Sequence, residues 1–203
     1  MAGRTERADA ARNRRAILLA AERLLSGNGQ RDVSVEQVAR EAGVGKGTVF
    51  HRFGSRAGLM RALVDERVGH LADRIEAGPP PLGPGADPAE RLVAFLDAVV
   101  ALATRNIALM SAYERAEEGE RQAAPAYQAW HAHVRALIAE ARPGLDAELL
   151  AHILLGSLHS DLVVHLLRRG EADRLSATLR DLVRTLLTRG APPAPPGTAA
   201  REG

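Results

Sequence analysis

A short polar segment near the N-terminus holds the side chains best suited to chemistry. Its hydrogen-bond donors and cations are Lys46, Thr48, His51 and Arg52. A short helix that carries donors near its N-terminus is typical of a helix that reads DNA in a groove. Gly45 and Gly47 would let backbone N–H groups approach a phosphate closely. The segment therefore predicts nucleic-acid binding.

The elements that must position this segment lie in residues 34–53. Ser34 can cap a helix, and Gln37 three residues later completes a capping box. Gly43 permits a tight turn, after which a second short helix of about residues 45–52 begins. The apolar residues expected to pack inward are Val35, Val38, Ala39, Val44 and Val49. Two short helices joined by a glycine turn are a helix-turn-helix.

The run VEQVAREAGVGKGTVFHRFGSRAGL, which begins at Val35, resembles the DNA-binding signature of the TetR family of bacterial transcriptional regulators. The resemblance covers about residues 12–72, a third of the chain. It implies an all-helical homodimer with a C-terminal ligand-binding domain. It also implies repression of transcription that ends when a small molecule binds.

The resemblance assigns roles to matching positions. Lys46 would read bases or backbone, and Ser34 and Arg56 would contact phosphates. Phe50 stands where the family usually has tyrosine, so a phenolic hydrogen bond to phosphate is lost. Arg56 replaces the usual lysine and keeps the charge. The predicted DNA-binding set is Ser34, Gly45, Lys46, Gly47, Thr48, Phe50, His51, Arg52 and Arg56.

The rest of the chain predicts more helices and no strand. Ala, Leu and Arg dominate, and all three favour helices. The fold class is therefore all-α, with about nine helices. The expected division is a DNA-binding domain at 9–60, a ligand-binding and dimerisation domain at 61–189 and a disordered, proline-rich tail at 190–203. A winged-helix protein is the rival DNA binder, but it would need a β-hairpin after the recognition helix.

The last two predicted helices are rich in leucine. Residues 147–169 read as one helix that is apolar nearly all round, and 172–188 follow with a leucine stripe. A helix of this kind must be covered on every side. A second copy of the chain would cover it, although a central helix inside one protomer is the alternative. The predicted dimer interface is Ile153, Gly156, Ser157, Leu175, Leu179, Leu182 and Leu186.

The middle helices hold the candidates for a small-molecule site. In a TetR-like body this region lines the inducer cavity, although aromatic residues at helical spacing usually belong to the core. Because leucine and alanine are abundant, the cavity is expected to be aliphatic and its ligand lipophilic. The predicted ligand-binding residues are Arg105, Met110, Tyr113, Tyr127, Trp130 and His159.

Catalysis and metal binding find little support. Histidine pairs on helices need spacings of three or four residues to share a metal, whereas His131 and His133 are two apart and His152 and His159 seven apart. We therefore expect no metal and no cofactor. The acidic cluster Glu114, Glu117 and Glu118 reads as a solvated helix end. Without a nucleophile, base and metal set, an all-helical enzyme is the least favoured function.

Composition and charge limit the chemistry, the compartment and the partners that we expect. The 203 residues include no cysteine, which excludes disulfides and thiolate metal sites. With neither a long apolar run nor a signal peptide, we expect a cytoplasmic protein that does not bind a membrane. Residues 1–60 contain eleven Lys and Arg against six Asp and Glu, which suggests an anionic partner for this part. We predict a homodimeric repressor that binds a palindromic operator and leaves it when a small molecule binds. The alternative is a DNA-binding helical regulator without such a ligand.

Overall fold

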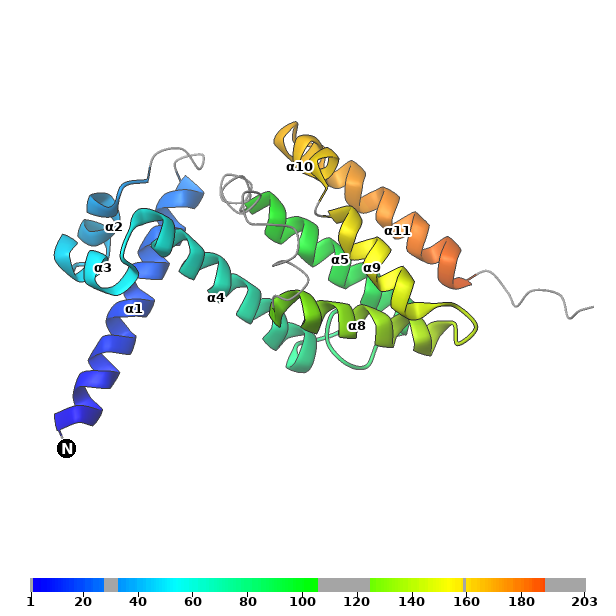
Figure 1. Ribbon diagram of the computed structural model, residues 1–203, viewed down its shortest axis with the longest axis horizontal. Coiled ribbons are helices and arrows are strands. Elements are labelled where there is room, and N and C mark those ends of the chain that lie inside the picture. Colours follow the sequence, from blue (N-terminus) through cyan, green and yellow to red (C-terminus); the bar gives the residue numbers. More distant parts are fainter. Residues whose placement is uncertain (1, 28–32, 106–124, 159, 189–203) are drawn as a thin grey trace, which may run out of the picture.

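The computed structural model describes residues 2–27, 33–105, 125–158 and 160–188, and within these ranges it holds nine helices and no strand (Figure 1). The all-α prediction is confirmed. The acidic cluster Glu114, Glu117 and Glu118 and the tail predicted at 190–203 lie outside the described residues. The helices are α1 (Ala2–Gly27), α2 (Val35–Glu41), α3 (Lys46–Phe53), α4 (Arg56–Ala77), α5 (Pro88–Arg105), α8 (Pro125–Ala141), α9 (Ala147–Leu158), α10 (Asp161–Arg168) and α11 (Ala172–Thr188).

The first three helices and the start of α4 enclose a small apolar core, and we call this part the head. Its centre is formed by Ile17 of α1, Val38 of α2 and Val49 of α3, each at most 1% exposed. Leu59 and Leu63 close it from α4. These helices can be stable together because each buries one apolar face in the shared core.

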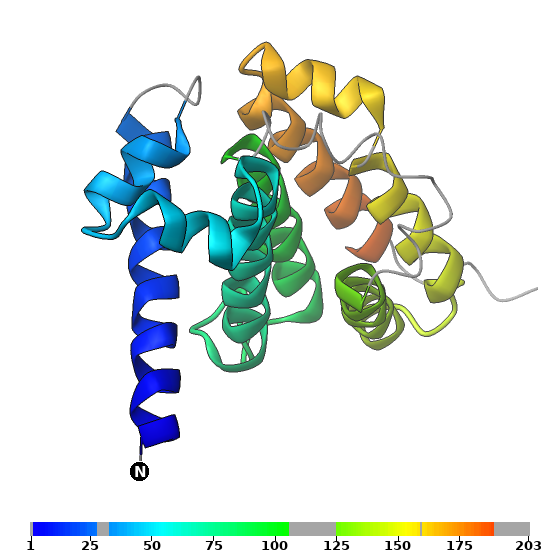
Figure 2. The ribbon, with the colours of Figure 1, turned by 60° about the vertical axis from the view of Figure 1, so that its left-hand side comes forward.

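The second core belongs to the remaining helices, and we call this part the body. α5 is central, because it contacts α4, α8, α10 and α11. Its Phe95 is fully buried and meets the Trp130 ring edge-on, with ring centroids 6.0 Å apart. α4 serves both cores, with Leu63 in the head and Leu71 in the body. Figure 2 shows α4 leading from α1–α3 into the body.

The helix predicted over 147–169 is wrong, because α9 ends at Leu158 and a new helix, α10, begins at Asp161. The Ser160 hydroxyl accepts a hydrogen bond from the Val163 N–H at 3.3 Å, which caps α10 and favours a fresh start. α9 has apolar side chains on both its buried and its exposed side, with Leu155 in the core and Ile153 exposed. In the described part of the chain no single helix is long and apolar enough to cross a membrane; α9 and α10 reach that length only as a bent pair.

Candidate nucleic-acid interface

The turn between α2 and α3 has the predicted local chemistry. The Ser34 hydroxyl accepts from the Gln37 N–H at 3.2 Å, and the Gln37 side chain accepts from the Ser34 N–H at 2.8 Å. The capping box is therefore confirmed. Gly43 has φ of 69°, a conformation that side chains with a Cβ rarely adopt, so glycine is required for the turn itself.

Lys46 stands at the exposed start of α3. Its ammonium makes an ion pair with Glu36 of α2 and lies 5.6 Å from the centre of the Phe50 ring. The Lys46 hydrogen bond holds the pKa of the Glu36 carboxyl below its usual value, because it favours the charged form. A DNA phosphate or base would have to take Lys46 away from Glu36.

Arg56 ties the start of α4 to the segment before α2. Its Nε donates to the Val33 carbonyl at 2.9 Å. A guanidinium has five N–H donors, and this bond uses one, so a phosphate can still be gripped by the others. Because the bond orients the side chain beside Ser34, Arg56 combines a structural role with the predicted phosphate contact.

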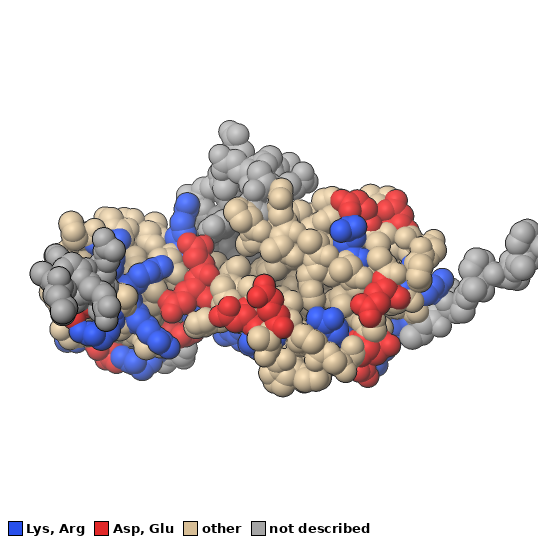
Figure 3. All heavy atoms as spheres, turned by 90° about the horizontal axis from the view of Figure 1, so that it is seen from below, with Lys and Arg blue, Asp and Glu red and all other residues tan. Residues whose placement is uncertain are grey.

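The other predicted contact residues cover the outer side of α3. Phe50 is 41% exposed, and His51 and Arg52 are also exposed, whereas Thr48 is half-buried. A Cβ on Gly47 would meet nothing within 4 Å, so the backbone there is open to a phosphate. In Figure 3, Lys and Arg side chains gather over the end of the molecule formed by the head. The surface is thus basic and rich in donors.

A comparison with known families decides the identity of this domain. Residues 17–63 match the family described as bacterial regulatory proteins, tetR family. Over this stretch the chain carries a TetR-family DNA-binding domain. It is a DNA-binding transcriptional regulator with a helix-turn-helix head. No curated protein matches it in sequence.

Solved structures extend the likeness over most of the regulator. A TetR/AcrR-family regulator from Thermobifida fusca is 22% identical, with a TM-score of 0.60 over 84% of this chain and 95% of that one. FadR from Bacillus subtilis, solved with stearoyl-CoA, is 19% identical, with a TM-score of 0.58 over 83% and 96%. NalD, the secondary repressor of the MexAB-OprM multidrug efflux pump in Pseudomonas aeruginosa, is 25% identical, with a TM-score of 0.51 over 88% and 97%.

The three predicted ligand-binding residues that the structure describes, Arg105, Tyr127 and Trp130, have different neighbours. Arg105 lines a cleft of about 590 Å³ between α4 and α5. Trp130 packs against Phe95, and the Tyr127 hydroxyl lies 2.9 Å from Nδ1 of His152. The other three candidates, Met110, Tyr113 and His159, lie outside the described residues.

The cleft between α4 and α5 has mixed chemistry. Its walls include the proline segment 79–81, Leu82 and small residues of α5, whereas three arginines, Arg67, Arg74 and Arg105, also line it. The cleft extends to the head, because Glu22 of α1 is part of its lining. Oε1 of Glu22 lies 3.2 Å from Nε of Arg67. Arg67 is not predictable from the sequence, since no local motif marks it.

The predicted dimer residues divide into two groups. Ile153 is 56% exposed, and Gly156, Ser157 and Leu182 are exposed as well. Leu179, by contrast, is only 6% exposed and lies in the body core, and Leu175 and Leu186 pack against that core. Leu179 faces inward because α11 turns this stripe toward α5. Leu149 and Leu162 are exposed apolar residues that the prediction did not include.

A further cluster, on α8 and α9, was not predicted from the sequence. His131, Glu148 and His152 come together there, beside Tyr127. The only local signal was the spacing of four between Glu148 and His152, which places both side chains on one face of a helix. His131 joins them through tertiary packing.

Proposed function

We propose that the regulator is a homodimeric repressor that binds a palindromic operator and releases it when a small lipophilic molecule binds the body. The observation that carries the DNA-binding half is the outer side of α3, where Lys46, Phe50 and Arg52 stand exposed beside an open glycine backbone. Repression is supported by likeness to NalD, which is named as a repressor.

The dimer is supported by exposed apolar side chains on the last three helices. Leu149 and Ile153 are one helical turn apart on α9, and Leu162 and Leu182 follow on α10 and α11. A two-fold axis through such a surface would make the two copies self-complementary. It would also place two α3 helices about 34–36 Å apart, one turn of DNA, so a palindrome is expected.

The ligand site that we propose is the cleft between α4 and α5. Its proline, leucine and alanine walls suit an apolar chain, and its arginines suit an anionic group on that ligand. The likeness to FadR supports this class, since FadR was solved with stearoyl-CoA, an acyl chain on a charged carrier. An amphipathic anion is therefore the class of ligand expected.

The proposed coupling between ligand and DNA runs through Arg67. This half-buried side chain of α4 makes an ion pair with Glu22 of α1 and also reaches the Arg105 carbonyl at 3.5 Å. An anion in the cleft would compete with Glu22 for Arg67 and loosen the head from the body. A ligand can shift the DNA-binding equilibrium only through such a difference in contacts.

The proposed domain division keeps 9–60 for DNA binding and 61–189 for ligand binding and dimerisation, with α4 shared. The site of action would be the cytoplasm. This arrangement predicts that ligand and operator oppose each other although they bind to different parts of the chain.

Selection of duplexes from a random library by the full-length protein tests the proposal. We expect a palindrome, with affinity falling by about 10³–10⁵ between about 50 and 200 mM salt if six to ten phosphates are neutralised. Long-chain acyl anions should then raise the melting temperature and release the operator. Arg67→Ala removes the ion pair with Glu22 that the ligand would break, so it should weaken operator binding without ligand and lose the ligand's further effect. Arg61→Ala, an exposed α4 arginine outside the cleft lining, is the control and should keep both.

Two results would count against the proposal. Binding that does not depend on salt or sequence would overturn the DNA-binding half. Operator binding that no lipophilic compound affects would favour the alternative of a helical regulator without a small-molecule ligand.

A further inference from the structure

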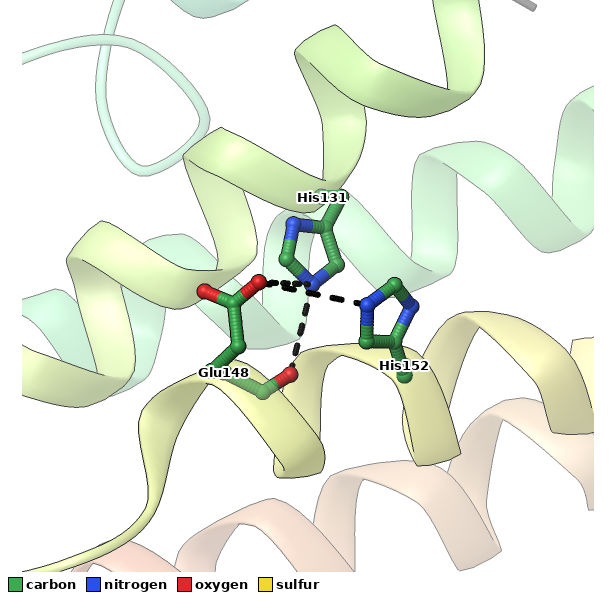
Figure 4. Close-up of side chains that lie close together, drawn as sticks. All are labelled: His131, Glu148 and His152. Carbon is green, nitrogen blue, oxygen red and sulfur yellow. Dashed lines mark hydrogen bonds and ion pairs between the residues drawn. The ribbon is translucent and has the colours of Figure 1, made fainter. Parts of the chain in front are cut away.

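Two packed helices of the body bring together three side chains that ligate metals. His131 comes from α8, and Glu148 and His152 come from one face of α9 (Figure 4). Nε2 of His131 lies 3.8 Å from Oε1 of Glu148, and Nε2 of His152 lies 4.0 Å from the same oxygen. One ligand atom from each residue falls within 4.8 Å of the others.

We propose that His131, Glu148 and His152 form a site for a late first-row divalent metal ion, with Zn²⁺ as the best fit. Two imidazoles and one carboxylate are a donor set that zinc takes in proteins, with one position left for water. The harder cations Ca²⁺ and Mg²⁺ prefer all-oxygen sites, so two imidazoles disfavour them.

The distances suit this ion after a small contraction. Zn²⁺ holds nitrogen and oxygen at about 2.0–2.2 Å, which separates the ligand atoms of a tetrahedral site by about 3.4 Å. The two nitrogen-to-oxygen distances exceed this value by only a few tenths of an ångström. His152 and Glu148 have exposed side chains, so both can rotate toward the ion without disturbing the core.

A neighbouring hydroxyl supports the site from outside. Oη of Tyr127 lies 2.9 Å from Nδ1 of His152. If Nδ1 carries the proton and donates to Tyr127, Nε2 is left with the lone pair that a metal needs. Metal-bound histidines generally have such a partner on their second nitrogen, and it fixes the tautomer and the ring orientation. Tyr127 is therefore a positioning residue for this site.

Three contacts around the cluster bear on metal binding. Nε2 of His131 lies 3.2 Å from the Glu148 carbonyl, and a metal would replace the proton on that nitrogen and release it to water. Arg135 lies 3.5 Å from Oε2 of Glu148, the carboxylate oxygen that faces away from both imidazoles. Because Arg135 pairs with Oε2, Oε1 of Glu148 remains available to the metal. The His131 and His152 rings, tilted by 31° with centroids 4.0 Å apart, already lie against each other.

The metal would join α8 to α9, two helices that pack against each other in the body. It would stabilise the folded chain, in which the three ligands meet, over the unfolded chain, in which they do not. The site is separate from α3 and from the α4–α5 cleft lining, so the proposal holds whether or not the chain is a repressor.

Zinc binding to the full-length protein, stripped with a chelator, tests the proposal. Isothermal titration should give one Zn²⁺ per protomer, and Co²⁺ in place of zinc should give the visible absorption of a low-symmetry site. His152→Ala should weaken zinc binding by tenfold or more, because the residue is 44% exposed and its loss spares the core. His165→Ala, an exposed histidine on α10, is the matched control and should bind as the wild type does.

Two further variants separate a metal site from a packing cluster. Tyr127→Phe keeps the ring but removes the hydroxyl, and it should cost about tenfold in zinc affinity. Glu148→Gln should abolish the zinc-induced rise in melting temperature while leaving the circular dichroism spectrum unchanged. The proposal fails if the wild type binds no stoichiometric zinc, or if His152→Ala binds zinc as tightly as His165→Ala.

Discussion

The head and the body of this regulator are both helical, yet they assemble their sites from very different stretches of chain. Every predicted DNA contact lies between Ser34 and Arg56, and the helices that hold them are consecutive. The α4–α5 cleft instead draws on residues from Glu22 of α1 to Arg105 of α5. The comparison teaches that local spacing specifies a recognition helix, whereas a cleft depends on how distant helices pack.

The two regions also differ in what they expose. The outer side of α3 presents cations, donors and one aromatic ring, which suit the charged backbone of DNA. The last three helices of the body expose leucine and isoleucine, which suit a second apolar surface. The predictions below test whether these surfaces have the separate tasks that we propose.

The largest effect is expected from charges on the proposed dimer face. Ile153→Arg combined with Leu182→Arg would bury unpaired cations in a dimer. We expect a monomer in analytical ultracentrifugation and an operator affinity lower by about 10²–10⁴, because the two heads no longer bind together. Leu19→Arg, at an exposed position of α1, is the control. A double variant that remains dimeric would show that another surface makes the dimer.

Two variants in the head should change DNA binding in different ways, one in overall affinity and the other in sequence preference. Arg56→Ala should weaken binding to all sequences alike and lower the salt slope by about one per subunit. Lys46→Ala should relax preference at one position of each half-site by about 1–3 kcal/mol. Anisotropy titrations on a randomised operator library measure both. If the two variants lose affinity uniformly, Lys46 contacts only phosphate.

A smaller effect is expected at the Glu36–Lys46 ion pair. Glu36→Gln frees Lys46 for DNA and removes a negative charge from the interface, so operator affinity should rise by at most about fivefold. Glu41→Gln makes the same charge change at the end of α2, where the carboxylate pairs with Arg23 at 2.9 Å. Equal gains in the two variants would mean that net charge alone is responsible.

The smallest effect concerns the body core at acid pH. Burial, with the nearby Arg91 charge, lowers the pKa of His133 from its ordinary 6.5. The unfolded chain therefore binds this proton more readily, and the free energy of unfolding should fall as the pH drops below about 6.5. Urea denaturation across this range should show a shallower fall for His133→Gln than for the wild type. His165→Gln, at an exposed site, should follow the wild type.

The sequence by itself determined the head. The Ser34–Gln37 capping box and the turn at Gly43 depend on residues that are close together in the chain, so both can be predicted from the order of residues. The helix-forming composition likewise determined the all-α class. The break at Ser160 was just as local, but the leucine-rich pattern on either side of it concealed the cap.

Only the tertiary structure decided the sites of the body. Periodicity shows that Leu179 and Leu182 belong to an amphipathic helix, but not which of them faces α5 and which faces solvent. No spacing predicts that Arg67 reaches Glu22 across 45 residues, or that His131 meets Glu148 and His152 from another helix. Each of these pairs depends on how two helices dock, which is the sum of many small packing energies rather than the property of any short motif.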